Sequence, residues 1–180
     1  MDCGGNSRRL GEVLQRYVGH TVAPVSGCYR DYIAWLQRQD AVASELFWKG
    51  QLAELEGPTQ LSQAVRGEAA DASGYGDHHQ RFDQSLTQRL KAFAQQHKTT
   101  FNTLVQSAWL LLLQRYAGQD AVCFGATVAG RPTELPGVEE QIGLFINALP
   151  VIASPRSEQS VIEWISQVQA QNLQLREHEH

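Results

Sequence analysis

The sequence has few cysteines and none of the short motifs that announce a cofactor or an activated nucleophile. Its cysteines, Cys3, Cys28 and Cys123, are an odd number without a CxxC spacing, and nothing in their pattern asks for an oxidising compartment. Cys123 lies in an apolar run and is interpreted as a small buried hydrophobe. A P-loop, a GxGxxG fingerprint and a serine nucleophile elbow are all missing. The sequence therefore gives no support for a nucleotide-binding protein or a serine hydrolase.

The chain also lacks an excess of positive charge and a long apolar segment. Its formal net charge of −4 offers no basic surface for a nucleic acid. The N-terminus has no apolar core of a signal peptide, and the longest uninterrupted apolar run, 108–113, is too short to cross a bilayer. We therefore expect a cytoplasmic protein that binds neither nucleic acid nor membrane.

Apolar spacing and capping residues predict an α/β or α+β chain, and we favour a mixed β-sheet flanked by helices. Asp40, Ser85 and Thr100 are expected to cap helices at their N-terminal ends, and Gly118 to end the helix that Thr100 begins. That helix carries a broad apolar stripe from Phe101 to Tyr116. Helices are predicted over 9–17, 29–39, 40–55, 85–97, 100–117 and 158–175, and strands over 78–82, 121–128 and 144–151.

The decapeptide 142–151, IGLFINALPV, is the most informative segment. Every residue but Asn147 is apolar or glycine, which predicts a strand buried on both faces, or nearly so. Burying an amide without a partner costs on the order of a few kcal/mol, so Asn147 needs one. Two alternatives stay open. Either the amide stitches the backbone together, or it points into a cavity where another group binds.

Several histidines invite a catalytic or metal-binding hypothesis that the pattern does not support. His78, His79 and Asp83 spell HHxxxD, with His79 as a candidate base, but the glycine expected after the aspartate for a tight turn is missing. We interpret Asp83 as a residue at a helix start, where its charge suits the helix dipole. His178 and His180 stand at i, i+2 in a charged tail and would not share a helix face, so no metal site is expected there.

Arg131 stands between Gly130 and Pro132 in a predicted turn. A loop arginine can bind an anionic ligand, and it can equally form a structural salt bridge. We favour the salt bridge, which is the commoner role of a loop arginine. Periodicity and spacing alone therefore lead no further than an α/β domain.

Two segments resemble the signatures of one family. The segment 29–35, YRDYIAW, resembles the YxDYxxW signature of nonribosomal peptide synthetase condensation domains. The segment 142–149, IGLFINAL, is similar to that family's IGxFxNT element, with Ala148 in place of the usual threonine. The two come in the family's order, and FWKGQLAEL and FGATVAGRP between them also fit. By this resemblance, the chain is most of the C-terminal half of a condensation domain.

The resemblance implies one half of a chloramphenicol acetyltransferase-like fold over residues 1–180, without the N-terminal half and the final segment. Asp2 falls at the aspartate of the family's HHxxxDG motif, where its implied role is structural, and Cys3 stands in place of the glycine. The catalytic histidines of that motif would lie upstream of Met1.

The resemblance also implies an amide-forming reaction. In the family, an acceptor amine attacks a donor thioester, and both groups are held on the phosphopantetheine arms of carrier domains. Asn147 matches an asparagine near the substrate tunnel. The other residues that the resemblance assigns to the tunnel are Gly125, Arg131, Gly143 and Phe145.

The implied partners are peptidyl or aminoacyl carrier domains and the missing N-terminal half, with no cofactor bound directly and no metal. Without the two histidines, residues 1–180 alone are expected to be inactive. The alternative is a stand-alone, non-catalytic module that binds a carrier protein or its acyl-phosphopantetheine arm. Self-association is expected if apolar surface is left exposed.

Overall fold

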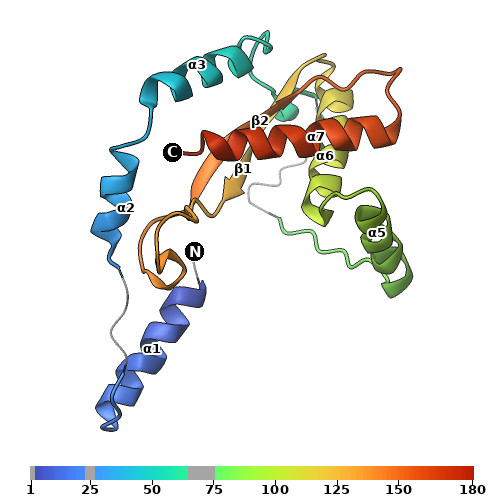
Figure 1. The fold of residues 1–180 in the computed structure, drawn as a ribbon. Helices are drawn as coiled ribbons and strands as arrows, with labels where there is room; N and C mark the ends of the chain where they lie inside the picture. The colour runs from blue at the N-terminus through green and yellow to red at the C-terminus, as the bar shows by residue number, and fades with distance from the viewer. Residues whose placement is uncertain (1–2, 23–26, 65–75) are drawn as a thin grey trace. The chain divides into compact units, whose positions relative to one another are not determined.

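The computed structural model describes residues 3–22, 27–64 and 76–180, so Asp2 lies outside the described residues. In chain order the elements are α1 (Cys3–Tyr17), α2 (Tyr29–Leu36), α3 (Ala41–Leu52), α4 (Leu61–Ala64), α5 (Gln84–Gln96), α6 (Phe101–Ala117), β1 (Val122–Val128), the 3-10 helix η1 (Val138–Glu140), β2 (Asn147–Ala153) and α7 (Val161–Glu177) (Figure 1). β1 and β2 pair with each other. The α/β class is confirmed, although the sheet described has two strands rather than the larger mixed sheet expected.

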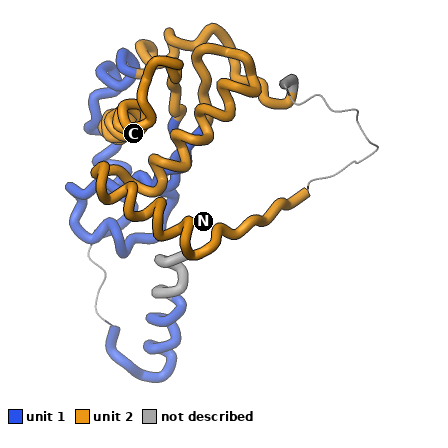
Figure 2. Tube along the Cα trace, turned by 90° about the vertical axis from the view of Figure 1, so that its right-hand side faces the viewer, with its two compact units in different colours: residues 1–47, 125–149, 178–180 blue, residues 48–124, 150–177 orange. Residues whose placement is uncertain are grey.

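The chain divides into two compact units that alternate along the sequence (Figure 2). Unit 1 comprises residues 1–47, 125–149 and 178–180, and unit 2 comprises residues 48–124 and 150–177. Each unit is therefore assembled from segments that are distant in sequence.

The core of unit 2 lies where α6 and α7 pack together with the buried ends of the two strands. Polar groups cross the helix pair: the indole Nε1 of Trp164 donates to the carbonyl oxygen of Ser107 (3.2 Å), and the Thr103 hydroxyl donates to Gln169 Oε1 (2.6 Å). These bonds satisfy groups that burial would otherwise leave unpaired. The apolar core residues are Leu110, Leu113, Val122, Val151, Ile152, Ala153, Trp164, Ile165, Val168 and Leu175.

α6 buries a different face from the one its largest apolar residues predict. Its buried residues are Thr103, Ser107, Leu110 and Leu113. On the predicted stripe, by contrast, Val105 is 50% and Leu112 is 48% exposed. The face that α7 covers carries Thr103 and Ser107, which bond to Gln169 and Trp164, so the broad apolar stripe does not coincide with the buried face. Unit 2 therefore carries apolar surface along this helix.

Other predicted apolar faces are exposed as well. Helical spacing predicts an inward face of Leu10, Val13, Leu14 and Tyr17 for α1, but these residues are between 64% and 89% exposed. For α3 it predicts that Leu46 and Leu52 are buried, but they are 66% and 49% exposed. In α7 the spacing predicts an inward face of Val161, Ile162, Ile165, Val168 and Leu175. This face is buried only from Ile165 onward, and Val161 is 66% exposed. The predicted helices form, although α1 begins at Cys3 rather than at residue 9 and α4 is not among the predicted helices. Their apolar stripes are covered only in part by the described residues.

The capping predictions are mostly confirmed. Asp40 Oδ1 accepts from the backbone N–H of Val42 and of Ala43 (3.0 Å each) at the start of α3. Thr100 caps α6, and Gly118 ends it in the left-handed region with φ 63°. The prediction of Ser85 as the cap of α5 is wrong: Asp83 occupies that position and accepts from the backbone N–H of Leu86 (2.6 Å).

The predicted strand over 78–82 is not formed, and its residues are exposed and irregular. A strand needs hydrogen bonds from a neighbour, and β1 and β2 bond to each other in the described sheet. Among the described helices, none is long and apolar enough to cross a membrane.

Candidate functional site

Unit 1 brings the two sequence signatures into one aromatic cluster. We define the signature cluster as Tyr29, Tyr32, Trp35, Arg131 and Phe145. The ring of Phe145 meets Tyr29 edge-on at 5.3 Å and Tyr32 at 4.7 Å between centroids, and Tyr32 stacks on Trp35 at 6.0 Å. Such pairs add about 0.5–1.5 kcal/mol each beyond the area they bury. The aromatic residues of YRDYIAW thus form the pocket that receives the phenylalanine of IGLFINAL.

Arg131 closes this cluster on one side. Its Cζ lies 4.1 Å from the centroid of the Phe145 ring, a cation–π distance. Its Nη1 donates to the carbonyl oxygens of Val138 and, at 3.2 Å, of Gln141. These contacts tie the loop after β1 to the approach to β2. These contacts favour a structural role of Arg131 over anion binding, because the guanidinium is held by backbone carbonyls.

Two glycines allow the backbone to pack this tightly. Gly130 has φ 53°, and a Cβ there would collide with the carbonyl oxygen of Phe145. A Cβ on Gly143 would collide with the ring of Tyr29. Both positions therefore require glycine, one of them also for its left-handed conformation. Gly125, in contrast, has open space around it within 4 Å.

The decapeptide is buried on one face rather than on both. Phe145, Leu149 and Val151 are 2%, 4% and 1% exposed, whereas Leu144 is 75% and Ile146 is 38% exposed. Phe145, Leu149 and Val151 lie at alternate positions, as on one covered face of an extended segment, and Asn147, in the same register, is the exception. Asn147 belongs to the exposed set, so the prediction that its amide is buried is wrong.

The amide of Asn147 nevertheless has backbone partners. Its Oδ1 accepts from the backbone N–H of Ala148 (2.8 Å), and its Nδ2 donates to the carbonyl oxygen of Glu179 (2.8 Å). Asn147 therefore stitches the first residue of β2 to the end of the chain. An amide has two N–H groups and two lone pairs, so one of each has no protein partner in the part of the chain that is described.

Two histidines that follow α7 contact two residues of α3. We call this second group the tail cluster: Ser44, Phe47, His178 and His180. The hydroxyl of Ser44 lies 2.8 Å from His180 Nε2 and 3.4 Å from His178 Nδ1. Phe47 stacks on the imidazole of His178 at 4.1 Å between centroids. His180 meets Trp35 edge-on at 6.1 Å, so the tail cluster adjoins the signature cluster within unit 1.

Burial perturbs one titratable group of the signature cluster. Desolvation raises the pKa of the Tyr32 phenol, with further contributions from Tyr29 and from Glu179. The phenol therefore stays protonated at neutral pH and does not act as a base. In unit 2, burial likewise raises the pKa of the Cys123 thiol.

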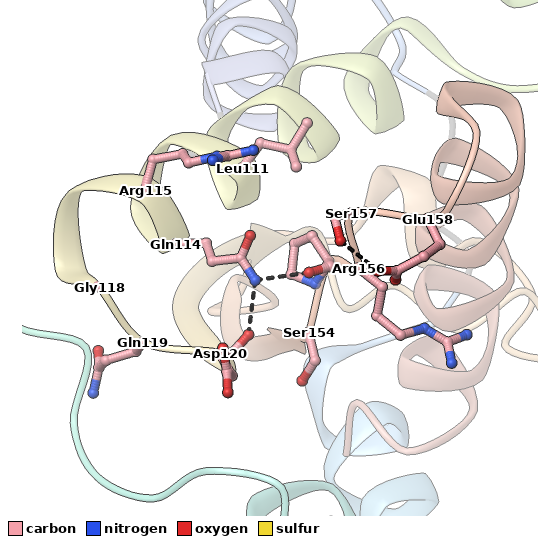
Figure 3. A pocket seen from close by; sticks show the side chains of 11 residues that line it. Leu111, Gln114, Arg115, Gly118, Gln119, Asp120, Ser154, Arg156, Ser157 and Glu158 are labelled. Atoms are coloured by element: carbon pink, nitrogen blue, oxygen red, sulfur yellow. Dashed lines mark hydrogen bonds between the residues drawn. The ribbon is translucent and has the colours of Figure 1, made fainter.

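Unit 2 has a separate polar pocket of about 700 Å³ at the C-terminal end of α6. Gln114 joins its two sides, because its Nε2 donates to the carbonyl oxygens of Asp120 (3.0 Å) and Pro155 (2.7 Å) (Figure 3). Arg115, Arg156, Asp120 and Glu158 contribute two charges of each sign to the lining. No group of three potential metal-ligating side chains occurs among the residues that are described.

Comparison with protein families matches residues 13–180 to the family described as Condensation domain. The chain belongs to the condensation-domain family. It is 46% identical over 154 residues to a linear gramicidin synthase protein of Brevibacillus parabrevis, an alignment that covers 84% of this chain and 2% of that protein. It is thus similar to a short segment of a synthase, and the resemblance seen in the signatures is confirmed.

Solved structures share the fold. The SgcC5 protein from Streptomyces globisporus matches with a TM-score of 0.70 at 18% identity, over 98% of this chain and 40% of that one. The first condensation domain of the calcium-dependent antibiotic synthetase matches with a TM-score of 0.66 at 18% identity, over 91% of this chain and 37% of that one. The chain therefore spans about 40% of the SgcC5 chain and shares its fold over that part.

In this condensation-domain chain, three of the predicted tunnel residues lie together: Arg131 and Phe145 belong to the signature cluster, and Gly143 lies against its Tyr29. Gly125 lies apart in β1, in an exposed position. Sequence reasoning missed Ser44 and the carbonyl of Glu179, because a serine inside a helix and a backbone carbonyl carry no sequence signal. The tunnel assignment itself stays a prediction.

Proposed function

We propose that this chain is part of a condensation domain that forms an amide bond between a carrier-bound acyl or peptidyl donor thioester and a carrier-bound aminoacyl acceptor. The observation that supports it is the signature cluster, in which the residues of the two family signatures pack on one another around Phe145. The contacts within this cluster would hold the start of β2, and with it Asn147, in a fixed position.

In the proposed reaction the acceptor amine attacks the carbonyl carbon of the donor thioester. A C–N bond forms, the C–S bond breaks, and the donor's phosphopantetheine thiol leaves with a proton, while the amine gives up a proton to a base. Two histidines upstream of this chain would orient or deprotonate the amine. Asn147 would contribute its remaining N–H and lone pair to the reacting groups at the tunnel, which Gly125, Arg131, Gly143 and Phe145 would help to form.

The proposed partners follow from this reaction. Carrier domains would bring both substrates on phosphopantetheine arms, so no cofactor is bound by the chain itself. The remainder of the condensation domain would supply the other wall of the tunnel and the histidines, with Asp2 as the structural aspartate. A cytoplasmic location suits such a pathway. The exposed apolar residues of α1 and α6 favour self-association of the chain when it is isolated.

A reconstituted assay with both carriers loaded tests the proposal, with the amide product detected by mass spectrometry. A condensation domain that contains residues 1–180 and the upstream histidines should form the amide, and residues 1–180 alone should not. Absence of product from the intact domain across a panel of aminoacyl and acyl carriers would contradict the enzymatic proposal. Carrier binding without turnover by that intact domain would favour the alternative, a non-catalytic module that binds a carrier protein or its acyl-phosphopantetheine arm.

A further inference from the structure

We propose that Ser44 is a positioning residue for Asn147, which it orients through the two histidines and the Glu179 carbonyl of the tail. This inference rests on the proposed amide-forming function and adds to it a residue outside both family signatures. All of the groups concerned belong to unit 1.

The backbone at Ser44 is held firmly. Its N–H donates to the carbonyl oxygen of Asp40 (3.1 Å), and the carboxylate of Asp40 caps the same turn of α3. Ser44 is 7% exposed. Leaving a buried hydroxyl unpaired is unfavourable, so hydrogen bonds at this position are favoured. The partners that this structure offers are the rings of His178 and His180.

The serine hydroxyl has one donor and two lone pairs, so it can serve both imidazoles at once. It donates to one ring nitrogen and accepts an N–H from the other, which requires complementary tautomers of the two histidines. Phe47 stacks on His178 with 16° between the ring planes, and Trp35 meets His180 edge-on. The hydroxyl and these two rings thus immobilise the residues on both sides of Glu179.

Two planar peptide units join residues 178 and 180, so few backbone conformations remain at Glu179 when both ends are held. Holding residues 178 and 180 therefore restricts the direction of the Glu179 carbonyl, which accepts from Asn147 Nδ2 at 2.8 Å. The terminal torsion of asparagine has a broad, nearly two-fold preference. The Glu179 carbonyl removes this ambiguity, and it directs the free N–H and lone pair of the amide away from the tail.

Turnover by the intact condensation domain tests the inference through a double-mutant cycle of Ser44→Ala and Asn147→Ala. We expect Ser44→Ala to lower kcat about tenfold, the loss typical of a misoriented group, with the KM for each loaded carrier nearly unchanged. In the Asn147→Ala background the same change should have no further effect, because the serine acts through the asparagine. Ser44→Thr retains the hydroxyl and should recover most of the activity.

The matched control is Ser107→Ala in unit 2. Ser107 is 3% exposed, and its hydroxyl has no hydrogen-bond partner among the described groups, so its removal should leave kcat unchanged. Unchanged kcat for Ser44→Ala, or additive losses in the double variant, would overturn the positioning role. If Ser44→Ala does not fold by circular dichroism, His178→Phe, which keeps the stack on Phe47 and removes Nδ1, takes its place in the cycle.

Hydrogen exchange gives a second readout that needs no turnover. The N–H of Ala148 is held by Asn147 Oδ1, so its exchange reports on the orientation of the amide. A peptide covering 144–149 should exchange its amide hydrogens about tenfold faster in Ser44→Ala than in the wild-type domain. In Ser107→Ala the same peptide should exchange at the wild-type rate. A faster exchange in a domain that forms no amide would refute the proposed function and leave the coupling of Ser44 to Asn147 intact. Unchanged exchange would refute that coupling.

Discussion

The phenol of Tyr29 donates a 3.0 Å hydrogen bond to the carbonyl oxygen of Leu144, and its ring covers Gly143. Because a Cβ at position 143 would collide with that ring, Gly143→Ala should displace Tyr29 from Phe145. We expect a loss of about 1–3 kcal/mol in the free energy of unfolding, the cost of overpacking a filled core. Urea denaturation of the purified protein measures it.

Gly125→Ala is the control for that experiment, because nothing lies within 4 Å of a Cβ at this position. It should change the stability by no more than about 0.5 kcal/mol, as exposed substitutions usually do. Equal losses in the two variants would mean that the contact with Tyr29 is not the cause.

Arg131→Lys should be destabilising although it conserves the charge. The planar guanidinium donates to two backbone carbonyls and lies over Phe145, a combination that a single ammonium cannot reproduce. We expect a loss of about 1–2 kcal/mol, measured by the urea midpoint. Arg115→Lys, at an exposed position of α6, should leave the midpoint in place, and a matching drop there would contradict the geometric argument.

Gln141→Met should raise the stability. Gln141 is 2% exposed, and neither its Nε2 nor its Oε1 has a hydrogen-bond partner in the described structure. Methionine has a similar volume and no polar group to desolvate, so a gain of about 1–2 kcal/mol follows. Gln114→Met provides the opposite case, since the Gln114 amide donates to two carbonyls and its loss should destabilise. A thermal melt of both variants decides the point, and destabilisation by Gln141→Met would show that this amide is satisfied.

The N-terminus of α7 should respond to pH through Glu163. The backbone N–H and then the hydroxyl of Ser160 lower the pKa of this carboxyl from its ordinary value of 4.5. A carboxyl with a lowered native pKa contributes stability that is complete above its ordinary pKa and is lost as the pH falls through the native one. Denaturation curves recorded from neutral pH downward should show this loss in the wild type and a smaller one in Glu163→Gln. Identical pH profiles would exclude the capping contribution.

Local chemistry made the helices and their caps predictable, and tertiary contacts decided which faces are buried. Thr100 and Gly118 act within a few residues of themselves, so their roles can be inferred from the sequence. The buried face of α6 depends on α7, whose Gln169 and Trp164 bond to Thr103 and Ser107. The apolar periodicity of α6 predicts the opposite face, because it carries no information about polar partners on another helix.

The candidate site divides in the same way. The five residues of the signature cluster all lie in segments that the family resemblance identifies, and the structure brings them together. His178 and His180 were set aside because their spacing does not fit one helix face, and they lie beyond the end of α7. Their convergence on Ser44 joins segments more than 130 residues apart, a relationship that no local pattern encodes.

The alternation of the two units bears on how condensation domains can be recombined. Unit 1 draws on residues 1–47, 125–149 and 178–180, so a chimaera made with one crossover between residues 48 and 124 would take the rings around Phe145 from one parent and Phe145 itself from the other. An exchange of residues 48–124 and 150–177 as a pair would instead transplant one unit whole. Chimaeric condensation domains made with paired crossovers should therefore fold more often than those made with a single crossover.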